Sequence, residues 1–220
     1  MKPSVDLKVD WCSYEAAKYA VEHWHYSKTM PAGKTVKIGV WEKEQFIGVV
    51  IFSLGCNRHI HIPFGLKSTE VCELTRIALT EHASTVSKMI RFSLKLLQKQ
   101  SPNIRLVVSY AAPYHNHHGG IYQAANWIYV GRGTTSKHCN PYIKKNGQII
   151  HFRTVSGICA KLGVPRTIEN LKKLGYRMIN TAPKHKYVYP LDKAMRRQVE
   201  PLRKPYPKRM RAADSSDLST

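Results

Sequence analysis

Residues 109–127, with the sequence SYAAPYHNHHGGIYQAANW, concentrate the side chains of this 220-residue chain that could carry chemistry. The segment holds three histidines, three tyrosines and a Gly-Gly pair directly before a helical pattern. A strand end that feeds a helix N-terminus leaves backbone N–H groups available to an anion or an oxyanion. We therefore expect an active or binding site in this segment.

The three histidines of this segment, His115, His117 and His118, are candidate metal ligands. Their HNHH arrangement lacks the i,i+4 spacing of a helical metal motif, and no carboxylate adjoins it. Ligands must also converge in space before they bind a metal. A solvated histidine-rich loop is the favoured alternative, and the metal site stays open.

Two further positions could carry chemistry. His25 and Tyr26 end the first predicted helix, immediately before a Gly/Pro loop that could close over a ligand. The alternative for His25 is packing at a helix C-terminus. Arg76 lies in an otherwise apolar strand, where a cation is costly unless it meets an anion. That anion is either a donor or substrate group, or a structural carboxylate from Glu73 or Glu70.

Hydrophobic periodicity and turn residues predict the elements that position these side chains. The strand at 71–81 is expected to alternate, with Cys72, Leu74, Arg76 and Ala78 on one face. Ser13 and Ser84 are the expected helix caps. The predicted fold class is α/β (α+β). Helices are expected at residues 13–25, 84–98, 119–126, 156–163 and 167–175, and strands at 35–42, 45–55, 71–81, 104–112, 127–133, 185–192 and in a hairpin around Asn146-Gly147.

Charge and motifs narrow the function classes. Lys plus Arg number 35 against 14 Asp plus Glu, which gives a net charge of +21. Such an excess predicts a polyanionic partner, with nucleic acid favoured over an anionic membrane surface. No apolar run of membrane-spanning length and no signal-peptide core is present, so we expect a cytosolic chain without a membrane partner. The common NTPase, dinucleotide, serine-hydrolase and zinc-protease motifs are absent, and five scattered cysteines without a CxxC pair argue against a disulfide framework or a cysteine zinc site.

The composition changes after residue 190. Residues 1–190 are expected to form one catalytic domain, and residues 191–220 a basic, partly disordered C-terminal arm broken by prolines. The alternative is a solubilising tail without a specific partner. The cations expected to contact DNA are Arg58, Lys67, Arg132, Lys144, Lys145, Arg196, Arg197, Arg203 and Lys204.

Three motifs resemble one known family. HWHYS, ELTRIAL and SYAxPxxxHxGGIYQAANWIYVGR are similar to segments of the Mom DNA-modification proteins of Mu-like bacteriophages, and the order of elements resembles the GNAT N-acetyltransferase fold. The resemblance extends from about Val9 to Arg153. It implies a GNAT-like mixed central sheet flanked by helices, and conversion of adenine in double-stranded DNA to N6-carbamoylmethyladenine. It further implies protection of phage DNA from host restriction in the bacterial cytoplasm, and it is compatible with a homodimer. The site residues carried over by the resemblance are His25, Tyr26, Arg76, Ser109, Tyr110 and Tyr122.

Two departures from these patterns matter. Ala112 stands where the family pattern reads Asp, the natural general base, so the chain is either a natural variant or an engineered inactive one; we favour the second. The glycine-rich turn that grips CoA in acetyltransferases is absent, which argues against classical acetyl-CoA. A different phosphate-bearing donor, such as an aminoacyl-tRNA, is compatible with the chain, and iron is associated with the family. The expected phosphate-binding side chains at the helix N-terminus are Ser84, Thr85, Ser87 and Lys88.

Two other functions remain open. One is an ordinary GNAT-type N-acyltransferase that uses acetyl-CoA and acts on a protein or a small amine. The other is a non-enzymatic nucleic-acid-binding protein, in which the histidine and tyrosine side chains form a stacking surface for single strands.

Overall fold

A computed structural model of the chain describes residues 6–55, 57, 59–133, 142–144, 147, 149–179 and 181–208, without the side chains of Tyr114 and Arg153. The chain divides into two compact units, which we describe separately. The core unit comprises Met1–Ala111, His118–Gly131 and His185–Thr220. The inserted unit comprises Ala112–His117 and Arg132–Lys184.

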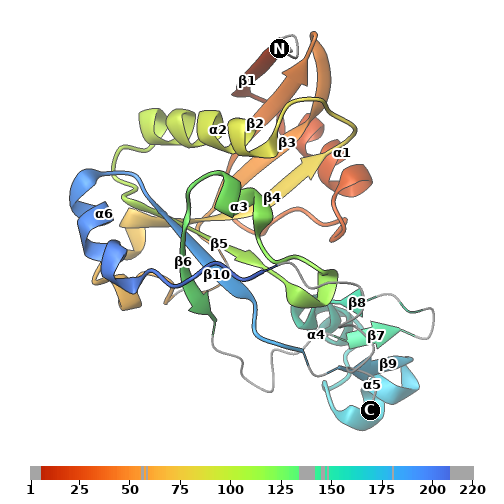
Figure 1. Ribbon diagram of the computed structural model, residues 1–220. Coiled ribbons are helices and arrows are strands. Elements are labelled where there is room, and N and C mark those ends of the chain that lie inside the picture. Colours follow the sequence, from red (N-terminus) through yellow and green to blue (C-terminus); the bar gives the residue numbers. More distant parts are fainter. Residues whose placement is uncertain are drawn as a thin grey trace. The chain divides into compact units, whose positions relative to one another are not determined.

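A seven-stranded mixed sheet forms the centre of the core unit, with strand order β1-β2-β3-β4-β5-β10-β6 (Figure 1). Strands β4 and β5 are parallel, whereas β1-β2, β2-β3, β3-β4 and β5-β10 are antiparallel. This sheet confirms the predicted α/β class with a mixed central sheet. The strands are β1 Leu7–Trp11, β2 Thr35–Glu42, β3 Gln45–Ser53, β4 Val71–Leu79, β5 Leu106–Ala111, β6 Ile128–Arg132 and β10 His185–Pro190.

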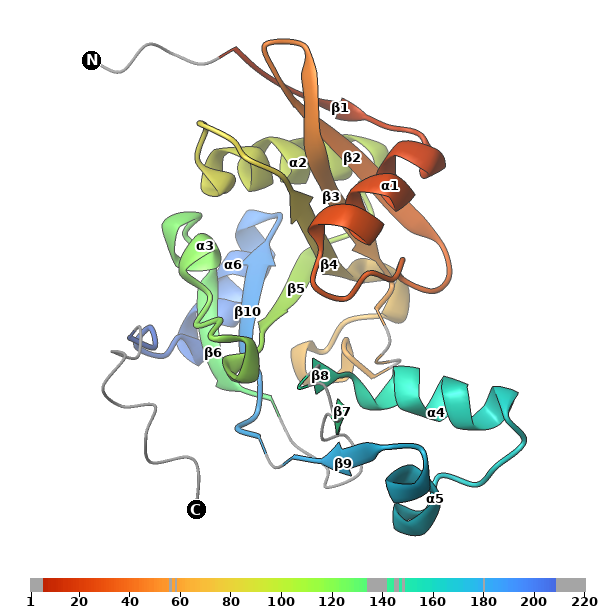
Figure 2. The same cartoon turned by 90° about the vertical axis from the view of Figure 1, so that its right-hand side faces the viewer.

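Helices cover both faces of this sheet (Figure 2). Helices α2 (Val86–Gln100) and α3 (Gly120–Ala124) pack on one face over the largest buried cluster. Helix α1 (Tyr14–Trp24) packs on the other face over β3 and β4, and α6 (Lys193–Val199) packs there over β5 and β10. Helix α2 joins β4 to β5 and supplies the crossover connection that two adjacent parallel strands require.

Local signals account for most of these boundaries. The Ser13 side chain accepts a hydrogen bond from the Ala16 N–H and caps α1, as predicted. Lys43 and Glu44 both have positive φ angles, as the tight turn of the predicted β2-β3 hairpin requires. The predicted cap at Ser84 is wrong, because α2 begins one residue later with Thr85 at the N-cap position.

The predicted strict alternation along β4 is also wrong. The register with β3 shifts between Ile51 and Phe52, which leaves Thr75 as an extra residue between Leu74 and Arg76. A bulge of this kind reverses the side-chain alternation beyond it. Leu74 consequently packs on the α2 face, whereas Ala78 packs under α1.

The C-terminal segment differs from the expected arm. Residues 193–199 form α6, whose N-terminus is capped by Asp192, and residues 203–208 lie along β6 and α3. The Lys204 N–H donates to the Tyr129 carbonyl oxygen at 2.8 Å, and the Tyr206 hydroxyl donates to the Trp127 carbonyl oxygen at 2.6 Å. The predicted boundary at residue 190 therefore differs from the structure, because residues 191–208 pack onto the core unit.

The inserted unit has its own small sheet and core. Its antiparallel strands lie in the order β8-β7-β9, and the predicted Asn-Gly hairpin corresponds to β7-β8, with Asn146 outside the described residues. Helix α4 begins four residues earlier than predicted. No helix among the described residues is long and apolar enough to cross a membrane. The elements are β7 Tyr142–Lys144, β8 Ile149–Ile150, α4 Phe152–Lys161, α5 Ile168–Lys173 and β9 Tyr176–Met178.

Candidate active site

The parallel strands β4 and β5 stay paired over only part of their length. Their pairing runs from Val71 opposite Leu106 to Glu73 opposite Val108, and no further pair is recorded between the described residues of the two strands. Beyond that point β4 remains paired with β3, and β5 remains paired with β10. Ligands of α/β proteins bind where the carboxyl ends of parallel strands open in this way. The predicted residues Arg76, Ser109 and Tyr110 all lie at this opening.

A buried hydroxyl pair lies at the start of the opening. Ser109 Oγ is 2.8 Å from the Leu74 carbonyl oxygen and 2.8 Å from the Tyr122 hydroxyl oxygen. The Ser109 hydroxyl has one proton, and a carbonyl oxygen can only accept it. Tyr122 therefore donates its own proton to Ser109, and the pair links α3 to both strands.

Packed rings hold Tyr122 in place. Its ring lies 5.1 Å from that of Trp127 and 5.2 Å from that of Tyr187, measured between centroids. The Tyr187 hydroxyl donates to the His118 carbonyl oxygen at 2.6 Å and accepts from Gln123 Nε2 at 3.0 Å. Burial raises the pKa of Tyr187 to about 12 and raises that of Tyr122 as well. Both phenols are therefore protonated at neutral pH.

Glu73 lies at this opening, and its sequence pattern indicated only a structural ion pair with Arg76. Burial raises the pKa of Tyr110, and the negative charge of Glu73 raises it further. The same charge also acts on Tyr26 and Tyr122, so these groups share one electrostatic environment. Gly55 makes room for this carboxylate, because a Cβ atom there would lie 2.4 Å from Glu73 Oε2.

Arg76 joins the loop after α1 to β4. Its Nε donates to the Thr29 carbonyl oxygen at 3.1 Å, and its Nη1 donates to the Thr75 carbonyl oxygen at 2.8 Å. Burial raises the pKa of Tyr26, and the positive charge of Arg76 opposes that shift. Arg76 thus positions the loop that carries the predicted His25-Tyr26 pair.

His25 is buried, with 7% of its surface exposed, and its ring lies 4.2 Å from that of Tyr26. The backbone N–H of Ser27 donates to His25 Nδ1 at 3.0 Å. A ring nitrogen that accepts this bond carries no proton, so the neutral ring bears its proton on Nε2. Tyr26, by contrast, is 55% exposed and available to a ligand.

A carboxylate of the protein itself accepts hydrogen bonds from the backbone N–H groups that precede α2. The Glu42 carboxylate on β2 accepts from the Ala83 N–H at 2.9 Å and from the Ser84 N–H at 2.6 Å. Although partial burial opposes the shift, these bonds lower the pKa of Glu42. Thr85 and Ser87 face each other across 3.3 Å between their hydroxyl oxygens, and the side chain of Lys88 is exposed. The expected phosphate position thus already holds a protein anion.

The histidines of the HNHH segment do not form a metal centre in the part of the chain that the structure describes. The rings of His115 and His117 lie 6.0 Å apart in the inserted unit, and His118 belongs to the core unit. Burial, together with the charges of His117 and Lys184, lowers the pKa of His115 to about 4. No group of three His, Cys, Asp or Glu residues that could hold a metal ion occurs among the described residues.

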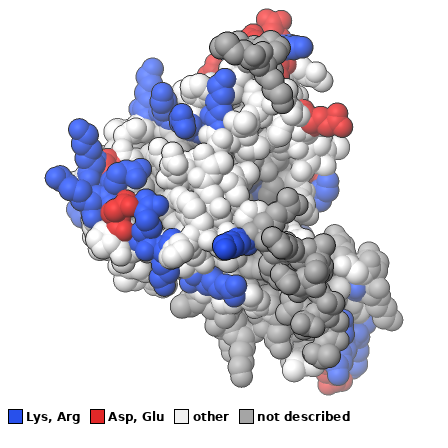
Figure 3. Space-filling view, viewed as in Figure 1, with Lys and Arg blue, Asp and Glu red and all other residues white. Residues whose placement is uncertain are grey.

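Basic side chains distinguish both units. On the face shown in Figure 3, Lys and Arg gather over α6 and along α2. Among residues 132–184, Glu169 is the only acidic residue against eleven Lys and Arg. Of the cations expected to contact DNA, Lys67, Arg196, Arg197, Arg203 and Lys204 lie in the core unit, Arg132 and Lys144 lie in the inserted unit, and Arg58 and Lys145 lie outside the described residues.

Ala112 directly follows β5 and is buried, with 3% of its surface exposed. Its carbonyl oxygen accepts from the N–H groups of His115 and His117 at 3.0 and 3.2 Å. The residue is the first of the inserted unit's segment Ala112–His117. Ala112 therefore takes part in this turn through its backbone, and its methyl side chain offers no acid or base.

Comparison with known proteins identifies a related sequence, similar solved structures and a protein family. The methylcarbamoylase of Escherichia phage Mu is 23% identical over 212 residues, which cover 93% of this chain and 85% of that protein. Similar solved structures include an N-acyl amino acid synthase from uncultured soil microbes, with 11% identity, a TM-score of 0.47 and coverage of 90% and 96% of the two chains. Another is the spermidine N-acetyltransferase of Vibrio cholerae, with 7% identity, a TM-score of 0.44 and coverage of 84% and 95%. The Mom protein family matches residues 6–208, and the chain therefore belongs to that family.

Proposed function

We propose that this protein modifies adenine in double-stranded DNA, converting it to N6-carbamoylmethyladenine, and so protects phage DNA from restriction inside the bacterial host. Membership of the Mom family supports this proposal, as does the name methylcarbamoylase given to the similar protein of phage Mu. The net charge of +21 and the basic inserted unit fit a DNA substrate. The observation that carries the proposal is the polar cluster at the opening between β4 and β5.

The reaction requires a bond from N6 of adenine to a carbon of the donor. One N6 proton must leave, and the leaving group departs from the donor. A base in a duplex must first be extruded from the stack. The exposed ring of Tyr26 suits stacking against such a base. Glu73 is the carboxylate near Tyr26, Tyr110 and Tyr122 that can accept the proton.

An acetyl-CoA-dependent acyltransferase is the competing function. Such an enzyme binds the CoA pyrophosphate at the helix N-terminus after β4. Here the Glu42 carboxylate accepts the N–H bonds of Ala83 and Ser84, and its charge would repel a phosphate. This contact favours a group donor whose phosphate is not bound at the N-terminus of α2. Calorimetric titration with acetyl-CoA separates the two functions, because only the acyltransferase predicts saturable binding.

Mass spectrometry of nucleosides from plasmid DNA tests the proposal directly. Cells would express the chain or its Ala112→Asp variant, and the heavier deoxyadenosine would be quantified. Modification by the Ala112→Asp variant alone would support both the function and the view that Ala112 inactivates the chain. Modification by both would support the function and show that an aspartate at position 112 is dispensable. Unmodified DNA from both would contradict the proposed function.

Tyrosine variants test the site itself. In whichever chain is active, Tyr26→Ala should lower modification because it removes the stacking ring, whereas Tyr26→Phe keeps the ring and should retain most of the activity. Tyr19→Ala is the matched control, because Tyr19 is also half-exposed, on α1, and it should leave modification unchanged. Equal activity of Tyr26→Ala and Tyr19→Ala would remove the Tyr26 ring from the site.

A further inference from the structure

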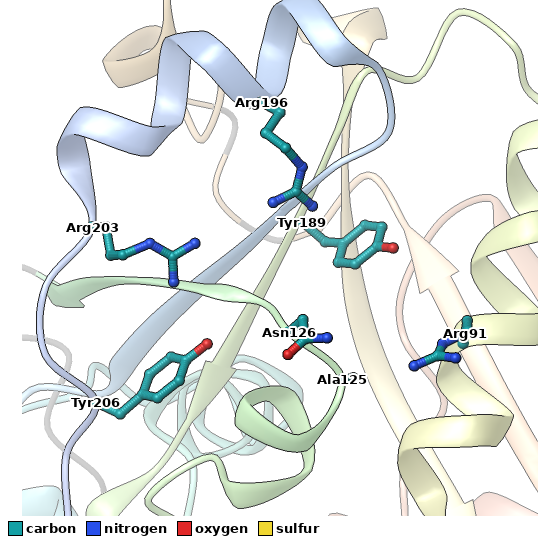
Figure 4. A pocket seen from close by; sticks show the side chains of 7 residues that line it. All are labelled: Arg91, Ala125, Asn126, Tyr189, Arg196, Arg203 and Tyr206. Atoms are coloured by element: carbon teal, nitrogen blue, oxygen red, sulfur yellow. The ribbon is translucent and has the colours of Figure 1, made fainter.

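A cavity of the core unit, separate from the candidate active site, is lined by three arginines and two tyrosines. Its volume is about 490 Å³, within the range of small-molecule sites. It lies between α2, the turn from α3 to β6, β10 and the segment after α6 (Figure 4). None of its lining residues belongs to the candidate active site. They are Arg91, Ala125, Asn126, Tyr189, Arg196, Arg203 and Tyr206.

Three guanidinium groups from different elements point into this space (Figure 4). Arg91 lies on α2 and Arg196 lies on α6. Arg203 directly follows the short 3-10 helix Glu200–Leu202. One carboxylate compensates part of their charge: Glu200 contacts Arg203 closely and lies 4.0 Å from Arg196. Arg91 has no ion pair within the described part of the chain. The cluster therefore keeps an excess of about two positive charges.

The cavity has fixed walls rather than the loose geometry of surface side chains. The Tyr206 hydroxyl donates to the Trp127 carbonyl oxygen at 2.6 Å, and the Tyr189 ring lies 5.5 Å from that of Trp127. The adjacent Lys204 N–H bonds the Tyr129 carbonyl oxygen, which holds the segment of Arg203 and Tyr206 against β6. These contacts place two tyrosine rings beside the guanidinium groups at little further cost in entropy.

This combination is suited to one chemical class. Guanidinium groups that converge bind phosphate through paired charge-assisted hydrogen bonds. Tyrosine rings offer a face for a planar base. Because the Glu200 carboxylate balances only one of the three positive charges, the arrangement favours a further anion such as a phosphate. We infer that this pocket binds the phosphate of a nucleotide, either a free one or a unit of a nucleic-acid strand.

The inference does not depend on adenine modification, so binding rather than activity tests it. The full chain would be titrated calorimetrically at fixed ionic strength with deoxyadenosine monophosphate, deoxyadenosine, a short single strand and its duplex. We expect saturable binding of the monophosphate and none of deoxyadenosine. Arg91→Met and Arg196→Met should each weaken binding about 10- to 100-fold, since each removes charge-assisted bonds.

Two control variants separate a site from general attraction to a basic surface. Lys95→Met on α2 and Lys193→Met on α6 remove the same charge from the same helices, and neither Lys95 nor Lys193 lines the pocket. They should leave binding of the monophosphate unchanged. If the pocket variants also weaken strand binding, the phosphate belongs to nucleic acid; if they weaken only monophosphate binding, the ligand is a free nucleotide. Absence of saturable binding to every phosphate probe, or equal losses in pocket and control variants, would overturn the inference.

Discussion

The buried hydroxyl pair of Ser109 and Tyr122 makes a quantitative prediction. Ser109→Ala leaves two groups without their present partner, the Leu74 carbonyl oxygen and the Tyr122 hydroxyl. Each unsatisfied buried group costs about 1–3 kcal/mol, so the loss of both partners should lower the free energy of unfolding by about 2–6 kcal/mol. Tyr122→Phe removes one donor and leaves the bond from Ser109 to Leu74 intact, so it should cost only about 1 kcal/mol.

The double variant completes the cycle. In the Tyr122→Phe background no phenol proton needs an acceptor, so Ser109→Ala should cost about 1–2 kcal/mol less than in the unchanged chain. Urea unfolding of the four proteins at neutral pH measures all the terms. Additive effects, or a larger loss for Tyr122→Phe than for Ser109→Ala, would refute the assignment of Tyr122 as the donor.

Three further changes test other contacts. Glu42→Gln should cost about 1 kcal/mol at pH 7, measured by urea unfolding. Because the folded pKa of Glu42 is lowered, its contribution is present above the unfolded pKa and is lost as the pH falls through the folded pKa. The difference in stability between the two chains should therefore shrink as the solution is acidified. Asp192→Ala removes the α6 cap and the 2.9 Å ion pair with Arg105, and it should cost about 1–2 kcal/mol in urea, whereas Asp192→Asn keeps the cap and should cost about half as much or less. Gly119→Ala should lower the thermal midpoint through a loss of about 2–4 kcal/mol, because a Cβ atom would lie 2.3 Å from the buried Tyr187 ring and φ is +87°; an unchanged midpoint would contradict that packing.

Features that depend on neighbouring residues were predictable from the sequence. Ser13 caps α1 through a bond to a residue three positions later, and Lys43-Glu44 forms a turn between two β-rich runs. The C-terminal segment was less predictable because its order depends on distant partners. Lys204 and Tyr206 donate hydrogen bonds to backbone carbonyl oxygens more than seventy residues away in the sequence. The composition of the segment does not indicate these partners.

The candidate site shows the same limit more sharply. The types of Arg76 and Ser109 and their place in strands were visible in the sequence, but strict alternation predicted Arg76 and Leu74 on the same face of the strand. The extra residue at Thr75 reverses the alternation beyond Leu74, so Arg76 shares the other face of β4 with Glu73. Because one inserted residue brings a cation and a carboxylate to the same face where β4 leaves β5, the bulge itself builds the charged half of the site. Glu73 could then supply a carboxylate even though position 112 carries none.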